Sequence, residues 1–370
     1  PIFGPEGSLF DRADSFRTSD GRRIHTHELP NLVREINPWK DHFCFHRDLK
    51  KLITEIRPDI VHTHSSKAGI LGRWAGWKGR KDARPAIVHT IHGPPFMPTT
   101  GRLLERTKTA IVNQIYAEAE RFAAKRCHLI LSVADAMTEQ FLARGIGHDE
   151  QYITVRSGME TEPFLHPAPG EDRAAVRTQL GFSDTDFVVG TVARLAEHKG
   201  HDDILDALGP SMGADERLRL LWVGDGWWKD RLLTRVKEMG LGGRVITTGL
   251  VPQGRVPAMM RAMDVLCHPS SREGLPRTVP QALLAGVCPV AYDVDGTREA
   301  CIDMETGRLV PHGDVHALRD AIAWLRDNPD ERVRLALAGR EMCLREFNHE
   351  AMIHHLERVY DRALKLAGAG

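Results

Sequence analysis

The sequence has no continuous apolar run long enough to cross a bilayer, no C-x-x-C pair and no low-complexity tract. Because a membrane-spanning helix needs about 18 or more apolar residues in a row, we expect a chain that does not span a membrane. The cysteines are scattered, and two lie inside predicted buried strands, which is typical of reduced thiols in a cytoplasmic protein. They are Cys44, Cys127, Cys267, Cys288, Cys301 and Cys343.

The sequence has no excess of positive or negative charge, because its 50 Lys and Arg residues balance its 50 Asp and Glu residues. Residues 1–160 nevertheless hold 24 basic against 19 acidic side chains, and the remainder holds 26 against 31. Between Lys67 and Arg84, Trp74 and Trp77 alternate with basic residues. This pattern fits peripheral contact with an anionic membrane at the inner face. It fits better two tryptophans that pack on a sheet beside a basic helix end. No nucleic-acid partner is indicated.

The chain is too long for one ordinary core, and its strands and helices alternate along most of its length. Such alternation predicts an α/β fold with parallel sheets covered by helices on both faces. We expect a first Rossmann-like domain over residues 1–163 and a second over residues 164–348. Residues 349–367 are expected to form a terminal helix. The first residues, Pro1 to Gly7, have the pattern of a strand turning into a loop, so we expect the chain to begin inside a domain.

The stretch from Asp264 to Ala300 predicts a β-α-β unit with strands at 265–268 and 288–292. Gly274 lies where the loop is expected to enter the helix, and free backbone N–H groups there can bind an anion such as phosphate. The carboxylate of Glu273 would repel that phosphate, so its oxygens are better suited to hydroxyl groups of the same ligand. The amide of Gln281 can both donate to and accept from a ribose diol. Together these residues suggest a sugar-phosphate ligand.

A second loop carries two cations. Arg194 and Lys199 follow the predicted strand 187–193 and precede a helix. Positive charge near a helix N-terminus is unfavourable without an anion. We therefore expect both side chains to contact a diphosphate and to stabilise it as a leaving group.

The run Glu273-Gly274-Leu275-Pro276, with Gln281 eight residues after the Glu, resembles the E-x7-E element of retaining glycosyltransferases of the GT-B fold, family 4 (group 1). The resemblance covers nearly the whole chain, and it departs from the pattern in having Gln281 for the second acid. It implies two doubly wound domains that face a cleft, with helix 349–367 crossing back onto the first. It also implies that about fifty residues of the first domain precede Pro1.

The resemblance assigns roles to individual residues. It implies that Arg194 and Lys199 contact phosphate, that Glu273 positions the donor sugar and that His92 lies near that sugar. Gly274, Leu275 and Gln281 would bind the nucleotide. Val251, in the loop after strand 245–248, would hold the base through backbone groups.

The implied activity is retaining transfer of a sugar from a UDP- or GDP-sugar to a glycan or lipid-linked acceptor in polysaccharide or glycolipid synthesis, with no cofactor and no metal. An alternative is a nucleotide-sugar epimerase of the same fold, which would turn over its substrate without an acceptor. Another is a non-catalytic nucleotide-binding remnant, which would bind without turnover. The sequence does not specify the sugar, the acceptor, the linkage or the oligomeric state.

Two patterns suggest metal sites as further alternatives. Asp293-Val294-Asp295 is the D-x-D sequence that other transferases use to hold Mn²⁺ or Mg²⁺, although a simple turn explains it. Histidines gather at the ends of two neighbouring strands, where zinc is an alternative to polar residues that need no metal. These are His62, His64, His89 and His92.

Overall fold

In a computed structural model, the structure describes residues 1–4, 10–33, 37–79, 84–93, 95–96 and 103–368. The chain divides into two compact units, which are described separately. The first contains residues 1–133, 137–155 and 355–370, and the second contains residues 134–136 and 156–354. The chain therefore changes unit at Val155, a few residues before the predicted boundary at 163.

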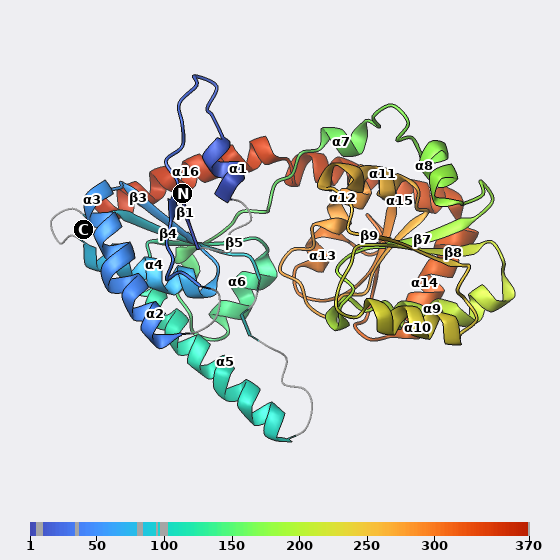
Figure 1. Cartoon of the computed structure of the whole chain (residues 1–370), viewed down its shortest axis with the longest axis horizontal. Coiled ribbons are helices and arrows are strands. Elements are labelled where there is room, and N and C mark those ends of the chain that lie inside the picture. The colour runs from blue at the N-terminus through green and yellow to red at the C-terminus, as the bar shows by residue number, and fades with distance from the viewer. Residues whose placement is uncertain (5–9, 34–36, 80–83, 94, 97–102, 369–370) are drawn as a thin grey trace. The chain divides into compact units, whose positions relative to one another are not determined.

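The first unit is built on a parallel sheet of four strands in the order β3-β4-β5-β6 (Figure 1). A two-stranded parallel pair, β1-β2, lies apart from it. The strands are β1 (Ile2–Phe3), β2 (His27–Glu28), β3 (Ile60–His64), β4 (Ala86–Ile91), β5 (Leu129–Ser132) and β6 (Tyr152–Thr154). The helices are α1 (Phe10–Ser15), α2 (Pro38–Phe43), a π-helical turn (Cys44–Leu49), α3 (Lys50–Ile56), α4 (Ser66–Gly79), α5 (Leu103–Ala124) and α6 (Asp135–Leu142).

The core of this unit explains why β4 is apolar along most of its length. All six β4 residues are buried, as expected for a strand covered on both faces. Helix α4 approaches closely at Gly69, where an added Cβ would lie 2.4 Å from the His89 ring. Between α4 and α5, the Arg73 guanidinium forms a buried ion pair with Glu120 at 2.6 Å.

The C-terminal helix α16 (His349–Gly368) belongs to the second unit up to His354 and to the first from His355 onward. Its Tyr360 hydroxyl lies 2.8 Å from Nδ1 of His62 on β3. The last turns of α16 are therefore part of the first unit's fold.

The second unit is a six-stranded parallel sheet in the order β12-β11-β10-β7-β8-β9. Its strands are β7 (Phe187–Val192), β8 (Leu218–Val223), β9 (Val245–Gly249), β10 (Val265–His268), β11 (Cys288–Tyr292) and β12 (Arg308–Val310). Its helices are α7 (Glu162–Leu165), α8 (Arg173–Leu180), α9 (His201–Ala214), α10 (Lys229–Glu238), α11 (Val256–Arg261), α12 (Thr278–Leu284), α13 (Thr297–Ala300), α14 (Val315–Asp327) and α15 (Pro329–Glu346). Two parallel-sheet units of this kind confirm the predicted fold class.

Gly274 lies in the loop that leads into helix α12, which begins at Thr278. Helix α15 was not predicted. The apolar spacing of residues 43–56 predicts a helix, and the structure extends this helical segment back to Pro38, where the Asn37 side chain accepts from the Lys40 amide.

Candidate functional site

The candidate site lies at the point where the second unit's strand order reverses. From β7 the chain moves outward through β8 and β9, then returns so that β10 pairs with β7 on its other side. In open α/β sheets, ligands bind beyond the carboxyl ends of the two strands that flank such a point. The loops that follow β7 and β10 carry Arg194, Lys199, Glu273 and Gly274, so the topology brings together the residues predicted to hold a sugar nucleotide.

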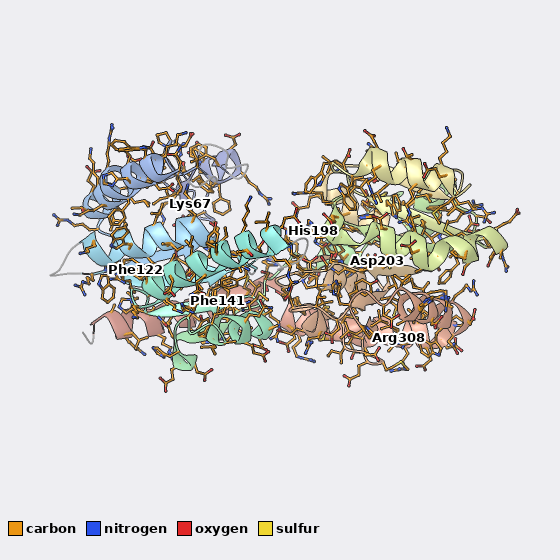
Figure 2. The ribbon with its side chains drawn as sticks, turned by 90° about the horizontal axis from the view of Figure 1, so that it is seen from below. Lys67, Phe122, Phe141, His198, Asp203 and Arg308 are labelled. Atoms are coloured by element: carbon orange, nitrogen blue, oxygen red, sulfur yellow. The ribbon has the colours of Figure 1, made fainter. Side chains whose placement is uncertain are left out.

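Hydrogen bonds hold these two loops against each other. The backbone carbonyl of His198 accepts from the Ser271 amide at 2.9 Å. Gly200 has φ +69°, and a Cβ at this position would lie 2.1 Å from the Pro269 carbonyl oxygen. Figure 2 labels His198 on the first loop and Asp203 in the helix that follows. Because only glycine fits at position 200, the close approach of the loops depends on it.

The centre of the site is the Glu273 carboxylate. Its Oε1 lies 2.5 Å from Lys199 Nζ and 3.1 Å from Nε2 of the buried His268. Burial alone would raise the pKa of Glu273, but the adjacent His268 imidazole and the Lys199 ammonium lower that pKa to about 2. Glu273 is therefore ionised at neutral pH and acts as an acceptor of hydrogen bonds and not as an acid.

Among the charged groups that act on the adjacent His198, cations outnumber acids. The pKa of His198 is lowered by burial and by the positive charges of Lys199, Arg272 and Arg194, and only Glu273 acts in the opposite direction. All four charged groups are thus within electrostatic range of one imidazole. Sequence reasoning missed Arg272 and His198, although each directly adjoins a predicted residue. An excess of positive charge is what a bound diphosphate requires.

Arg194 lies at the exposed edge of this group. Its guanidinium lies 5.5 Å from the ring centroid of Trp227, whose side chain is 66% exposed. Trp227 follows the turn Gly224-Asp225-Gly226 at the end of β8. This contact places a large exposed aromatic surface beside the predicted phosphate-binding cation.

Three of the predicted nucleotide-binding residues lie in loops that follow strands of the second unit, and the fourth lies in helix α12. Gln281 is half-buried in α12, and Leu275 is buried at 8% exposure in the loop before it. Val251 is half-buried after β9, beside Leu250, which is 82% exposed. The Gly274 carbonyl accepts from the Gly296 amide at 3.1 Å, so a second loop supports this one.

The first unit carries His92, which directly follows β4. Its Nε2 lies 2.9 Å from Nδ1 of His64, and the two rings are stacked. Burial lowers the pKa of both residues, for His64 to about 4, where the neighbouring His92 contributes as well. The pair is therefore neutral at neutral pH, and a single proton joins the two rings.

The remaining histidines of that group are occupied by other hydrogen bonds. His62 contacts Tyr360 and, through Nε2 at 2.7 Å, the Thr90 hydroxyl. His89 is buried, and its Nδ1 lies 2.9 Å from the Thr63 hydroxyl. Among the residues that the structure describes, no group of three or more His, Cys, Asp or Glu side chains is arranged to hold a metal ion.

The tryptophans between Lys67 and Arg84 are packed in the first unit. Trp74 stacks on Phe45 with 3.9 Å between ring centroids, and the Arg84 guanidinium lies 4.5 Å from the Trp77 ring centroid. Arg80 and Lys81 fall outside the described residues. The contacts favour the packing interpretation of this segment over a membrane patch. No helix in the described ranges is both long enough and apolar enough to pass through a bilayer.

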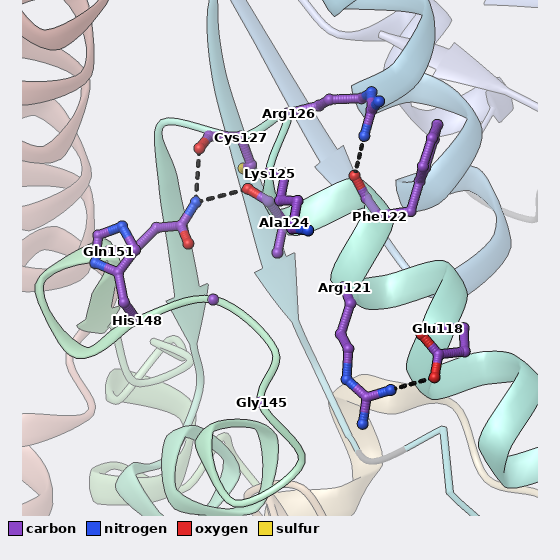
Figure 3. A pocket seen from close by; sticks show the side chains of 11 residues that line it. Glu118, Arg121, Phe122, Ala124, Lys125, Arg126, Cys127, Gly145, His148 and Gln151 are labelled. Carbon is purple, nitrogen blue, oxygen red and sulfur yellow. Dashed lines mark hydrogen bonds and ion pairs between the residues drawn. The ribbon is translucent and has the colours of Figure 1, made fainter.

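A hollow of about 740 Å³ lies near the C-terminal end of α5, and none of the predicted site residues lines it (Figure 3). Both arginines that line the hollow contact groups of α5. Arg126 donates to the Phe122 carbonyl at 2.6 Å, and Arg121 pairs with Glu118 at 2.6 Å. The Arg126 contact caps a carbonyl near the C-terminal end of α5, which is a structural role for this arginine.

Comparison with known proteins gives consistent matches along the chain. Residues 172–342 match the family described as Glycosyl transferases group 1, and residues 4–161 match Glycosyltransferase Family 4. The phosphatidyl-myo-inositol mannosyltransferase of Mycobacterium leprae is 35% identical over 319 residues, which is 85% of this chain and 76% of that protein. The 2-deoxystreptamine N-acetyl-D-glucosaminyltransferase of Streptomyces fradiae is 32% identical over 279 residues, which is 72% of this chain and 62% of that protein.

Solved structures show the same fold. The Anabaena protein HepE, in a crystal with UDP and glucose, superposes with a TM-score of 0.74 at 19% identity, covering 97% of this chain and 98% of HepE. A glycosyltransferase of Rickettsia africae superposes with a TM-score of 0.75 at 18% identity, covering 99% and 90%.

Proposed function

Because this chain belongs to the group 1 glycosyltransferases of family 4, with the GT-B fold, we propose that it transfers a sugar from a UDP- or GDP-sugar with retention of anomeric configuration and without a metal. That it is a glycosyltransferase follows from its family. The donor, the stereochemistry and the metal independence are the proposal. The acceptor is a glycan or a lipid-linked acceptor, in keeping with the phosphatidyl-myo-inositol named for one of the two relatives.

The observation that carries the proposal is the arrangement of Arg194, Lys199 and Glu273 at the strand-order reversal. Lys199 now pairs with Glu273, and a donor diphosphate would share that ammonium. The carboxylate would then be released to accept hydrogen bonds from hydroxyls of the donor sugar. Arg194 and Lys199 would stabilise the negative charge that develops on the diphosphate as the glycosidic bond breaks.

The other predicted residues complete the donor site. In this proposal the Gln281 amide holds the ribose, backbone groups near Val251 hold the base, and Gly274 and Leu275 shape the loop beneath the diphosphate. His92, kept neutral with His64, would hydrogen-bond a sugar hydroxyl and support positive charge at the anomeric carbon.

We also propose that the protein is cytoplasmic and binds an anionic membrane peripherally through the α2 surface. On α2, Trp39 is 77% and Phe43 is 48% exposed. The exposed bases Lys40, Arg47 and Lys50 lie on the same helical segment. Exposed aromatic rings beside lysine and arginine suit the interface of an anionic bilayer. The six free, buried cysteines are in keeping with a reducing compartment.

The proposal is tested by incubating the protein with a panel of UDP- and GDP-sugars, with and without glycan and lipid-linked acceptors, in buffer containing EDTA. We expect nucleotide release and a product of retained configuration only when an acceptor is present. Turnover without acceptor would indicate the epimerase, and binding without turnover the non-catalytic remnant. Lys199→Met should lower kcat/KM on the order of 10²-fold, whereas the exposed Lys237→Met should leave it unchanged.

A further inference from the structure

The Asp293-Val294-Asp295 sequence has no part in the proposed reaction, yet each of its carboxylates has a defined partner. Asp293 Oδ1 accepts from Arg298 Nε at 3.0 Å, near the surface. Asp295 Oδ2 accepts from the backbone amide of Glu273 at 2.7 Å. The two carboxylates therefore serve separate purposes, and the second contacts the loop on which the proposed donor site depends.

A second contact runs between the same two loops. The Gly296 amide donates to the Gly274 carbonyl at 3.1 Å. A Cβ at Gly296 would lie 2.3 Å from that carbonyl oxygen, so position 296 requires glycine. The Asp295 carboxylate thus accepts from the backbone amide of Glu273. The Gly296 amide donates to the carbonyl of Gly274, the next residue. The Asp295-Gly296 turn therefore holds the Glu273 amide and the Gly274 carbonyl in place.

The backbone at Asp295 is itself unusual. Its φ is +44°, in the left-handed region that residues other than glycine, asparagine and aspartate rarely adopt. Such a conformation persists only where the surroundings hold it, and it is often found at functional sites. Here it aims the carboxylate at the Glu273 amide. A charged acceptor on a backbone N–H makes a stronger hydrogen bond than a neutral one.

We propose that Asp295 is a positioning residue for Glu273. By fixing the Glu273 amide, it keeps the carboxylate at Lys199 and His268, in the orientation needed to receive the donor sugar. Without Asp295 the loop would retain its apolar anchors, Leu275 and Pro276, but the carboxylate would sample other orientations. The inference rests on the proposed function, because Glu273 has been given its role there.

The left-handed backbone offers a matched pair of variants in the full-length chain. Asp295→Gly adopts φ +44° without strain and removes the carboxylate that accepts from the Glu273 amide. Asp295→Asn also tolerates this conformation and retains an oxygen that can accept from the amide. We expect Asp295→Gly to lower kcat about 30-fold, the equivalent of one strong hydrogen bond. Its KM for the donor and its affinity for UDP or GDP should stay within about three-fold of wild type. Asp295→Asn should retain most of the wild-type kcat.

Hydrogen exchange of the peptide spanning residues 269–277 gives a readout that does not require activity. We expect faster exchange in Asp295→Gly than in wild type, and wild-type exchange in Asp295→Asn and in the control Asp293→Asn. If no sugar donor is turned over by wild type but exchange responds in this way, the proposed function fails while the positioning contact stands. Wild-type kcat in Asp295→Gly, or an equal loss of kcat in Asp295→Asn, would overturn the inference, as would unchanged exchange in Asp295→Gly.

Discussion

Acid should destabilise the second unit through His201, the first residue of α9. The side chain is 1% exposed, and neither ring nitrogen has a hydrogen-bond partner among the described residues. Its ring packs edge-on against buried Trp222, with 5.2 Å between centroids. Burial lowers the pKa of His201 to about 4, with Asp202 opposing and Lys199 adding to the shift.

The size of the effect follows from the difference between the folded and unfolded states. In the unfolded chain the pKa of His201 returns to its usual value of 6.5. The folded state holds the neutral form, so this contribution to stability is complete above pH 6.5 and is lost as the pH falls towards 4. At pH 5 the unfolded histidine is almost fully protonated and the folded one is not. Protonation of the unfolded state then lowers the free energy of unfolding by about 2 kcal/mol relative to its value at neutral pH.

The assay compares wild type with His201→Leu by urea unfolding at pH 7.5 and pH 5. Other titrating groups contribute equally to both proteins, so their effects cancel in the comparison. On acidification, the free energy of unfolding of wild type should fall by about 2 kcal/mol more than that of the variant. The control His166→Leu, whose side chain is 76% exposed, should behave as wild type. If His201→Leu loses as much stability on acidification as wild type does, the burial argument is wrong.

Further predictions concern the first unit. Glu120→Gln should lower the free energy of unfolding by about 3–5 kcal/mol, because it leaves the buried Arg73 cation without a counter-charge. Glu118→Gln, on the exposed face of the same helix, should cost under about 1 kcal/mol in the same urea titration. His64→Ala should lower kcat about five-fold by removing a hydrogen bond of about 1 kcal/mol from His92. His64→Asn, whose amide can replace Nδ1, should restore most of that loss, and equal kcat values in the two variants would contradict the role given to His64.

Much of the second unit could be predicted because buried parallel strands have a strong local signal. Short, mostly apolar runs identified β10 (Val265–His268) and β11 (Cys288–Tyr292) with the bounds that the structure has. Glycines and charged residues after such runs identified the loops of the candidate site. These signals depend only on neighbours in the sequence.

What could not be predicted depends on strand order and on long-range contacts. Nothing local to Lys199 or Glu273 indicates that the two side chains pair, because their contact requires β10 to lie beside β7. The Asp295 contact likewise joins two loops on either side of a helix and a strand. Helix α15 was missed for another reason. Its apolar periodicity is weak, although Pro329 at its first position and the acidic residues that follow are a usual helix start.

The bond between His62 and Tyr360 bears on how the protein is made. A ribosome releases β3 well before α16, because the hydroxyl that satisfies His62 lies 298 residues further along the chain. The second unit, by contrast, is encoded almost without interruption by residues 156–354 and can collapse while translation continues. The first unit is therefore complete only after the last turns of α16 have been synthesised, and until then the hydrogen bond to His62 cannot form.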